Sequence, residues 1–284
     1  MRTASFVALG LLGSMALIPQ AFGQAAGGLE DGHVTVGNTP SYFQGDFGTG
    51  STVDIFDDST YAQFKNRDVR IKLVAPYLVV SGLPNGAQLS GGAVVSRNSG
   101  AGNGGHGHSG GAGLSETTGS HSASGIGDVQ LALHYTVYHG EGLTPSIVPY
   151  TRVTFGTASA SQGLGTGKND YEFGIGIHDV VDARLFPFAH VGYRIVGNPS
   201  GDNLQNVVTY DLGASYALNP HNVLTAFFSG AQSEQPGYAG PADLIFAYNY
   251  NVTASGSGFQ VFFDKGLTNG SPDFGIGIGA QIVF

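Results

Sequence analysis

The sequence contains no cysteine and no tryptophan, and few of its residues are charged. Without cysteine there can be no disulfide framework, zinc–thiolate site or cysteine nucleophile. Charged residues make up 11% of the chain, against about 25% in ordinary soluble domains, so a soluble enzyme with a charge-covered surface is not expected. Intrinsic disorder is also excluded, because disordered chains have few aromatic residues, whereas 11% of this chain is aromatic.

Long apolar runs and simple repeats are also missing. After residue 20 no apolar run reaches the length of about 18 residues that a transmembrane helix needs, and there is no Gly-X-Y period. The net charge is −9, which disfavours nucleic-acid binding because phosphates require a basic surface. With 47 glycines, the composition indicates a glycine-rich and aromatic-rich all-β protein.

Residues 1–23 have the features of a secretory signal peptide. Arg2 supplies the positive start, residues 6–18 form the apolar stretch, and small residues ending at Gly23 supply the cleavage positions. We expect a mature chain of residues 24–284 that is exported beyond the inner membrane of a bacterium. An uncleaved anchor is the alternative, but this stretch is too short to cross a bilayer core of about 30 Å.

Apolar residues alternate with polar residues or glycine through almost the whole mature chain. In segment 274–284, for example, every second residue is apolar and three glycines and Gln281 lie between them. Only a β-strand places such residues on one face. About twelve strands are predicted, at 33–43, 67–81, 86–96, 126–139, 144–157, 169–182, 184–197, 206–219, 221–233, 242–253, 257–267 and 272–284.

The predicted connections alternate between short and long. The short ones are 82–85, 140–143, 182–183, 219–220 and 254–256, and the long ones are 44–66, 97–125, 158–168, 198–205 and 234–241. Tight periplasmic turns alternating with long external loops are typical of transmembrane barrels. The predicted fold class is therefore an all-β, transmembrane, antiparallel up-and-down β-barrel of about 12 strands, with both termini on the periplasmic side.

The apolar faces of the predicted strands carry no charge. Arg70 and Lys72, for example, lie on the face opposite to the apolar residues of their strand. An Arg or Lys facing lipid at mid-bilayer costs about 2–4 kcal/mol, so this pattern favours a membrane barrel. A soluble β-sandwich is the alternative, but it would need a charged outer face.

Two resemblances support this interpretation. The run 275–284 resembles the C-terminal assembly signal of bacterial outer-membrane barrels, which ends in an aromatic residue, here Phe284. The segments Ser124-Gly-Ile-Gly-Asp-Val129, Gly163-Leu-Gly-Thr-Gly167 with Asp170-Tyr171, and Leu267-Thr-Asn-Gly-Ser-Pro-Asp273 resemble the MetA-pathway of phenol degradation family of outer-membrane transporters.

The second resemblance covers about residues 30–284. It implies a barrel linked to uptake of aromatic or apolar compounds, and it carries over no catalytic residue. The Gly/His-rich insert at 99–123 departs from the family pattern.

The glycine-rich run 163–168 is not a phosphate-binding loop. Such a loop would need Gly where Gln162 stands and Ser or Thr where Asn169 stands, followed by a helix. We interpret this run as an external loop.

Segment 97–124 is rich in Gly, Ser and His. His106 and His108, with His121 as a third ligand, could bind a transition metal weakly. We favour the alternative of a flexible loop, because Gly/Ser runs bury too little apolar area to order themselves.

No sequence arrangement typical of a hydrolase or metalloprotease is present. Outer-membrane lipases use a Ser and a His at the lipid-facing rim, but His134, His178 and His190 lie on predicted polar faces. We therefore expect no catalysis, no metal and no cofactor.

The ionisable residues of the polar faces are the candidates for a pore lining. They are Arg70, Lys72, Asp128, His134, Arg152, Glu172, His178, His190, Arg194, Asp211 and Asp264. They could line a water-filled pore and set its selectivity, or form paired charges that fill a narrow lumen. With Asp54, Asp57, Asp58 and Glu116 placed in loops, we expect an acidic mouth above a locally basic stretch that suits carboxylated aromatics.

The functional prediction is an outer-membrane channel for passive uptake of small solutes, namely apolar or aromatic compounds or aromatic acids. A structural or adhesive barrel is the alternative, and an outer-membrane enzyme is a weaker one. The expected partners are outer-membrane lipid and lipopolysaccharide, the β-barrel assembly machinery and the small-molecule solute, with no nucleic acid.

Overall fold

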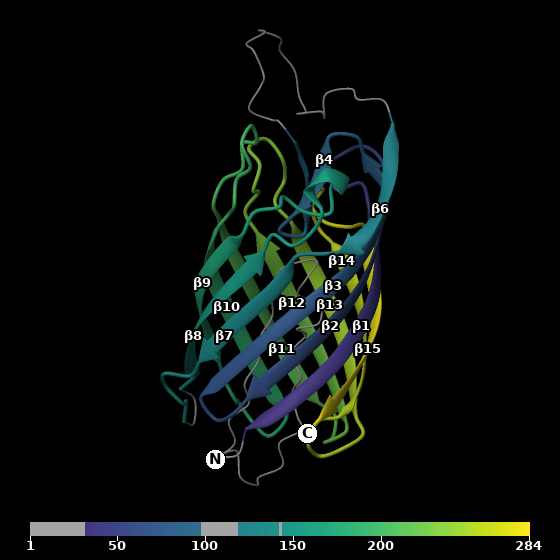
Figure 1. Ribbon diagram of the computed structural model, residues 1–284. Helices are drawn as coiled ribbons and strands as arrows, with labels where there is room; N and C mark the ends of the chain where they lie inside the picture. Colours follow the sequence, from purple (N-terminus) through teal and green to yellow (C-terminus); the bar gives the residue numbers. More distant parts are fainter. Residues whose placement is uncertain (1–31, 98–118, 142–143) are drawn as a thin grey trace.

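In the computed structural model, residues 32–97, 119–141 and 144–284 form a closed β-barrel (Figure 1). Its strands are β1 (His33–Gly45), β2 (Val53–Lys65), β3 (Val69–Pro84), β6 (Ser120–Ile126), β7 (Val129–Tyr135), β8 (Ser146–Phe155), β9 (Asp170–His178), β10 (Leu185–Ile195), β11 (Val207–Ala217), β12 (Asn222–Ala231), β13 (Ala242–Asn251), β14 (Gly258–Gly266) and β15 (Phe274–Val283). The predicted signal peptide and residues 98–118 lie outside the described residues.

The barrel is antiparallel and closes on itself. Each strand pairs with its neighbours along the chain, β1 pairs with β15, and β2 pairs with β3. Both β6 and β7 pair with β3, so they form one wall strand that is interrupted at Gly127 and Asp128. The wall therefore has twelve strand positions, which confirms the predicted closed antiparallel barrel.

Two of the predicted strand placements are wrong, although the count is right. Residues 53–65, predicted as loop, form wall strand β2. Residues 86–96, predicted as a wall strand, form a hairpin of β4 (Ala87–Ser90) and β5 (Ala93–Ser96) that pair only with each other. Strand β2 was not predicted, because acidic and hydroxyl residues interrupt the alternation of apolar residues in its sequence.

The two ends of the barrel differ. We call the end of the barrel where β1 begins and β15 ends in Figure 1 the lower end and the opposite end the upper end. The connections 156–169, 196–206 and 232–241 lie at the upper end, together with the β4–β5 hairpin. Of residues 82–85, predicted as a turn at the lower end, the first three belong to β3, and Asn85 begins the link to this hairpin.

Segment 97–124 also needs a correction at its far boundary. Residues 120–124, predicted as part of a flexible loop, belong to β6 and pair with β3. Arg97 at the near boundary donates its backbone N–H to the carbonyl of Gly86 at 2.7 Å.

Short turns with Asp or Asn side chains connect strands at the lower end. The Asp182 carboxylate accepts the backbone N–H groups of Arg184 and Leu185 at 2.7 and 2.8 Å, which lowers the pKa of Asp182 below its ordinary value. Asn219 accepts the N–H groups of His221 and Asn222 in the same way. Such side-chain-closed turns fix tight hairpins.

Burial alternates along every wall strand. On β9, for example, Phe173, Ile175 and Ile177 are exposed, whereas Glu172 before them and His178 after them are buried. The exposed residues form an apolar outer face, which a barrel in a bilayer requires. In the described ranges the only helix is the 3-10 turn Ala160–Gln162, and no helix there could span a membrane.

Inward-facing glycines make room for aromatic side chains. A Cβ added at Gly277 would lie 2.2 Å from the ring of Phe262, and one added at Gly174 would lie 2.4 Å from the ring of Tyr150. Both distances are far shorter than van der Waals contact. This close approach explains why glycine alternates with apolar residues in the last strand.

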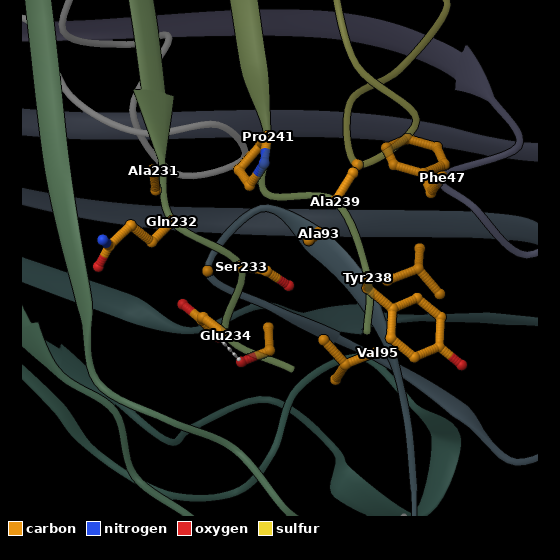
Figure 2. A pocket seen from close by; sticks show the side chains of 14 residues that line it. Phe47, Ala93, Val95, Ala231, Gln232, Ser233, Glu234, Tyr238, Ala239 and Pro241 are labelled. Atoms are coloured by element: carbon orange, nitrogen blue, oxygen red, sulfur yellow. Dashed lines mark hydrogen bonds between the residues drawn. The ribbon is translucent and has the colours of Figure 1, made fainter. Parts of the chain in front are cut away.

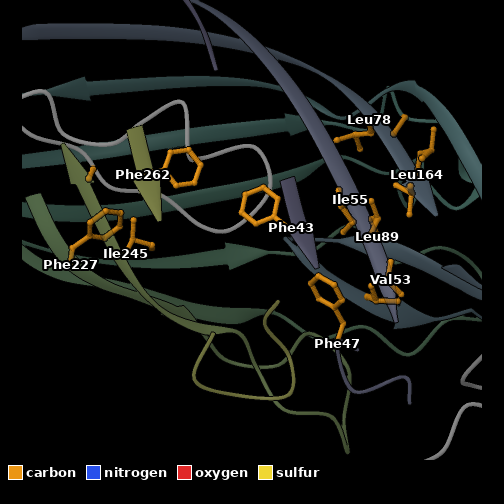
Figure 3. Close-up of a cluster of buried hydrophobic side chains, with 14 of the residues drawn as sticks. Phe43, Phe47, Val53, Ile55, Leu78, Leu89, Leu164, Phe227, Ile245 and Phe262 are labelled. Carbon is orange, nitrogen blue, oxygen red and sulfur yellow. The ribbon is translucent and has the colours of Figure 1, made fainter. Parts of the chain in front are cut away.

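A buried apolar cluster extends along the inside of the barrel (Figure 3). It joins Leu89 of the hairpin to Leu78 of β3, Ile55 of β2 and Leu164 of the 156–169 connection. The β4–β5 hairpin therefore packs against the inner side of the wall rather than extending it.

Candidate functional site

The β4–β5 hairpin bridges two upper connections. The backbone N–H of Leu89 donates to the carbonyl of Gly163 at 2.9 Å, on the β8–β9 side. On the β12–β13 side, the Gln235 side chain accepts the N–H of Ser96 at 2.8 Å. The space left between the hairpin and residues 231–241 is about 10 Å³ (Figure 2), room for about one water.

Glu172 is the centre of a buried ion-pair network below the hairpin. Its carboxylate accepts Arg152 Nη2 and Arg194 Nε, both at 3.0 Å, and the hydroxyl groups of Tyr150 and Thr209 at 2.9 and 3.2 Å. Glu172 itself is 2% exposed. Strands β8, β9, β10 and β11 each contribute one or two of these residues, so the network joins four strands.

The network continues to the hairpin through Glu234. Arg194 Nη1 donates to Glu234 Oε1 at 3.1 Å, and Ser90 Oγ at the end of β4 donates to Glu234 Oε2 at 2.5 Å. We call Arg194, Glu234 and Ser90 the hairpin latch. Neither Glu234 nor Ser90 was predicted, because both lie in segments whose sequence shows only loop or strand character.

Charges within this network balance. Two arginines, Arg152 and Arg194, face two carboxylates, Glu172 and Glu234. The expected locally basic stretch is therefore neutralised at this level of the lumen.

A cavity of about 70 Å³ lies between the hairpin and the network. It is lined by Pro76, Leu78, Leu89, Ser90, Gly91, Gly92, Asp128, Gln130, Arg152, Thr154, Leu164, Thr166, Asp170 and Arg194. This is enough room for several waters, and both arginines and two aspartates border it.

Nitrogen-bearing side chains gather in the lower half of the lumen. Arg70 is the cross-strand neighbour of His134, whose ring stacks on Tyr150 with centroids 5.3 Å apart. His178 Nε2 and His190 Nε2 are 2.8 Å apart.

Two further contacts tie these basic groups to the wall. Lys72 Nζ lies 3.8 Å from the Tyr61 ring centroid, a cation–π distance. His190 Nδ1 lies 3.8 Å from Asp211 Oδ2. In the described ranges, no three His, Asp or Glu side chains come together in an arrangement that could hold a metal ion.

Most predicted lining residues face inward. Those that are buried are Arg70, Lys72, His134, Arg152, Glu172, His178, His190, Arg194, Asp211 and Asp264. Asp128 is half-buried and accepts the N–H of Ala158 at 2.9 Å. It therefore also holds the start of the β8–β9 connection.

We call the inward residues Arg152, Glu172, His190, Arg194 and Asp211 of β8 to β11 the polar wall. The aromatic wall consists of Phe43, Phe227, Ile245 and Phe262 on β1, β12, β13 and β14, all at most 5% exposed. Its rings lie close together: the Phe43 and Phe262 centroids are 6.4 Å apart. Two sides of one lumen thus differ in chemistry.

Asp264 lies within the aromatic wall. Strand pairing aligns Asp264 with Gly275 and Ile245, which pair in turn with Phe43 and Phe227. The same role was predicted for Asp264 as for the polar-wall residues, but its cross-strand neighbours are Ile245 and Gly275, and its charged neighbour is the buried Asp243.

The remaining predicted residues lie elsewhere. Phe284 is 73% exposed and exchanges backbone hydrogen bonds with Val34 of β1. His121 bonds to the Asn85 side chain and the Gln162 carbonyl, both at 3.2 Å, whereas His106 and His108 lie outside the described residues. The acids placed at the mouth are strand residues: Asp57 is buried inside β2, and Asp54 and Asp58 face outward. Glu116 is outside the described part.

Comparison with known proteins gives structural but no sequence matches. No family model matches the chain, and no curated protein matches it. An outer-membrane channel from Pseudomonas putida F1 is similar in structure, with a TM-score of 0.58, 13% identity, and coverage of 94% of this chain and 99% of that one. The NanC porin gives a TM-score of 0.52 with 11% identity, covering 87% of this chain and 98% of that one. The chain therefore has the fold of bacterial outer-membrane channels.

Proposed function

We propose that the mature chain, residues 24–284, is an outer-membrane channel for passive uptake of small aromatic or apolar compounds and aromatic acids. The observation that carries this proposal is the division of the lumen into an aromatic wall and a polar wall. We infer that the ring of an aromatic solute would lie on the side of Phe43, Phe227 and Phe262, and that its carboxylate would face the polar wall. The signal peptide predicted at 1–23 and the MetA-pathway resemblance favour the same conclusion.

The exposed apolar outer face supports a position in lipid, and we propose lipopolysaccharide and membrane lipid as the surroundings of the barrel. The terminal Phe284 would be read by the assembly machinery. Flux follows the solute gradient, because no part of a barrel supplies energy. The β4–β5 hairpin narrows the upper lumen, and the cavity bordered by Arg152 and Arg194 is the passage beside it.

Transport by purified protein in liposomes tests the proposal. We expect ionised benzoate to enter protein-containing vesicles faster than arabinose, a polar solute of similar size, because only benzoate can use both walls. Vesicles with heat-unfolded protein are the control. Entry rates equal to that control for both solutes would reject transport and leave a structural or adhesive barrel.

A further inference from the structure

The outer face of β1 and β2 carries a polar cluster. Asn38 of β1 and Asp58 and Thr60 of β2 face outward, on the same side as the exposed residues Phe56 and Phe64. Asn38 Nδ2 donates to Asp58 Oδ1 at 2.6 Å and to Thr60 Oγ1 at 3.0 Å. We call these three residues the outer polar cluster.

This cluster lies at membrane depth. Asp58 is six residues above Phe64 on β2, and a tilted strand rises roughly 15 Å over that length. The apolar band of such barrels is about 25 Å tall. Asp58 therefore lies within the band, between two exposed phenylalanines.

No other charged residue of the described strands faces outward at this depth in the membrane. The other outward-facing charged residues, Asp54 and Lys265, lie next to a strand end, where a barrel meets lipid headgroups. The prediction that outward faces lack charge failed at Asp58, because β2 had been predicted as loop, and it also failed at Lys265, near the end of the predicted strand 257–267.

Hydrocarbon offers no donor to a carboxylate. Polar groups that face lipid are costly and mark functional or contact surfaces. Asn38 supplies one donor to Asp58, with both hydrogens of its amide used within the cluster. A molecule that packs against this face can supply a further donor.

We propose that a second copy of this chain covers the outer polar cluster and forms a two-fold dimer along β2. The Thr60 hydroxyl accepts from Asn38 and keeps its own hydrogen. That hydrogen can be donated to the Asp58 carboxylate of the second copy, and two-fold symmetry forms the same bond twice. The outer polar clusters of two copies are thus complementary to each other.

The surroundings of the cluster suit close approach of two walls. Thr60 pairs with Ala75 of β3, and Asp58 pairs with Pro40 of β1 and, on its other side, with the exposed Tyr77 of β3. The next outward residue of β2 is Ala62. Small side chains are typical of helix contacts within membranes because they let backbones approach, and the same packing argument holds here. This inference rests on membrane embedding and not on transport.

Cysteine cross-linking of the full chain tests the dimer, because the chain has no native cysteine. The variant Ala62→Cys, in native outer membranes, should give a dimer band with a short bismaleimide. The matched control is Leu212→Cys on β11, six strand positions away around the wall and also outward-facing, which should give none. Adding Asn38→Leu, Asp58→Leu and Thr60→Val to Ala62→Cys should abolish the band while the barrel stays heat-modifiable on gels.

The opposite results overturn the proposal. Equal cross-linking of both single-cysteine variants would show random encounter, and a band that survives the three apolar changes would show a different interface. Cross-linking to another protein alone would identify a different partner. The native mass of the wild-type protein in mild detergent gives an independent answer: two chains are expected, and one chain contradicts the dimer.

Discussion

The polar wall and the aromatic wall of the lumen hold the barrel together in different ways. On the polar wall, Glu172 of β9 accepts hydrogen bonds from four side chains, which belong to β8, β10 and β11. On the aromatic wall, Phe262 and Phe43 pack over glycines, because Gly277 and Gly275 leave space for their rings. One wall depends on charge pairing and the other on shape.

This difference separates what each wall can do. Paired charges are rigid, because removing one partner leaves an uncompensated charge in a low-dielectric interior. Aromatic surfaces accept many flat apolar groups and do not require one fixed partner. We infer that the polar wall fixes the geometry of the passage and that the aromatic wall provides its contact surface.

The largest effect is expected from breaking the polar wall. The variant Glu172→Gln leaves Arg152 and Arg194 without their shared carboxylate, which should lower the free energy of unfolding by about 3–5 kcal/mol. Urea unfolding in lipid or detergent measures it. Thr209→Val, which removes one hydrogen bond to the same carboxylate, should cost only about 1 kcal/mol. Equal losses of unfolding free energy in the two variants would mean that the ion pairs of Glu172 contribute no more than a single hydrogen bond.

The shape of the aromatic wall should give the next largest effect. In Gly277→Val the new side chain meets the Phe262 ring, since even a Cβ would lie 2.2 Å from it. Overpacking of this kind lowers the free energy of unfolding by about 1–3 kcal/mol. Combining Gly277→Val with Phe262→Ala should recover part of the loss. A double variant that is no more stable than Gly277→Val would contradict the steric explanation.

A smaller change should come from the hairpin latch that connects the polar wall to β4. The variant Ser90→Ala removes the hydroxyl that donates to Glu234 at 2.5 Å. We expect the barrel to stay folded and its single-channel conductance to rise or fluctuate more, because the hairpin is held less firmly. Ser161→Ala, in the exposed 3-10 turn, is the control. Identical current traces for the two variants would show that the hairpin latch does not influence conductance.

The smallest effect on either wall is expected at Phe284. Its side chain is 73% exposed and belongs to neither wall, so deleting it should lower the heat-modifiable folded fraction in cells without changing the conductance of the barrels that do fold. Gel shift assays and bilayer recordings on the same preparation separate the two. An unchanged folded fraction at low expression would show that Phe284 is not needed for assembly.

The alternation of apolar residues was enough to predict most wall strands. It succeeded for β9 to β15, where every outward residue of a strand is apolar or small over most of its length. It failed at β2, where Asp58 and Thr60 occupy outward positions. It also failed at β4 and β5, because an inward hairpin buries both faces and has the same short apolar pattern as a wall strand.

The inward side of each candidate residue was predictable, but its partners were not. Parity along a strand placed Arg152, Glu172 and Arg194 inside the barrel. Arg152 and Glu172 are cross-strand neighbours because of the register between β8 and β9. The alternation of residues within one strand does not determine the register between two strands. Glu234 joined them from a loop, and loop conformation has no periodic signal.

The ion selectivity of the variant Arg152→Glu tests most directly whether the polar wall borders a conducting passage. The change reverses one charge at the 70 Å³ cavity beneath the hairpin, so the reversal potential in a low-salt gradient should shift toward cations. The shift should shrink at 1 M salt, where the Debye length is about 3 Å. Arg184→Glu, an equal charge change in an exposed lower turn, should give a much smaller shift. A reversal potential of Arg152→Glu equal to that of the wild type at low salt, in barrels that are folded, would contradict the account.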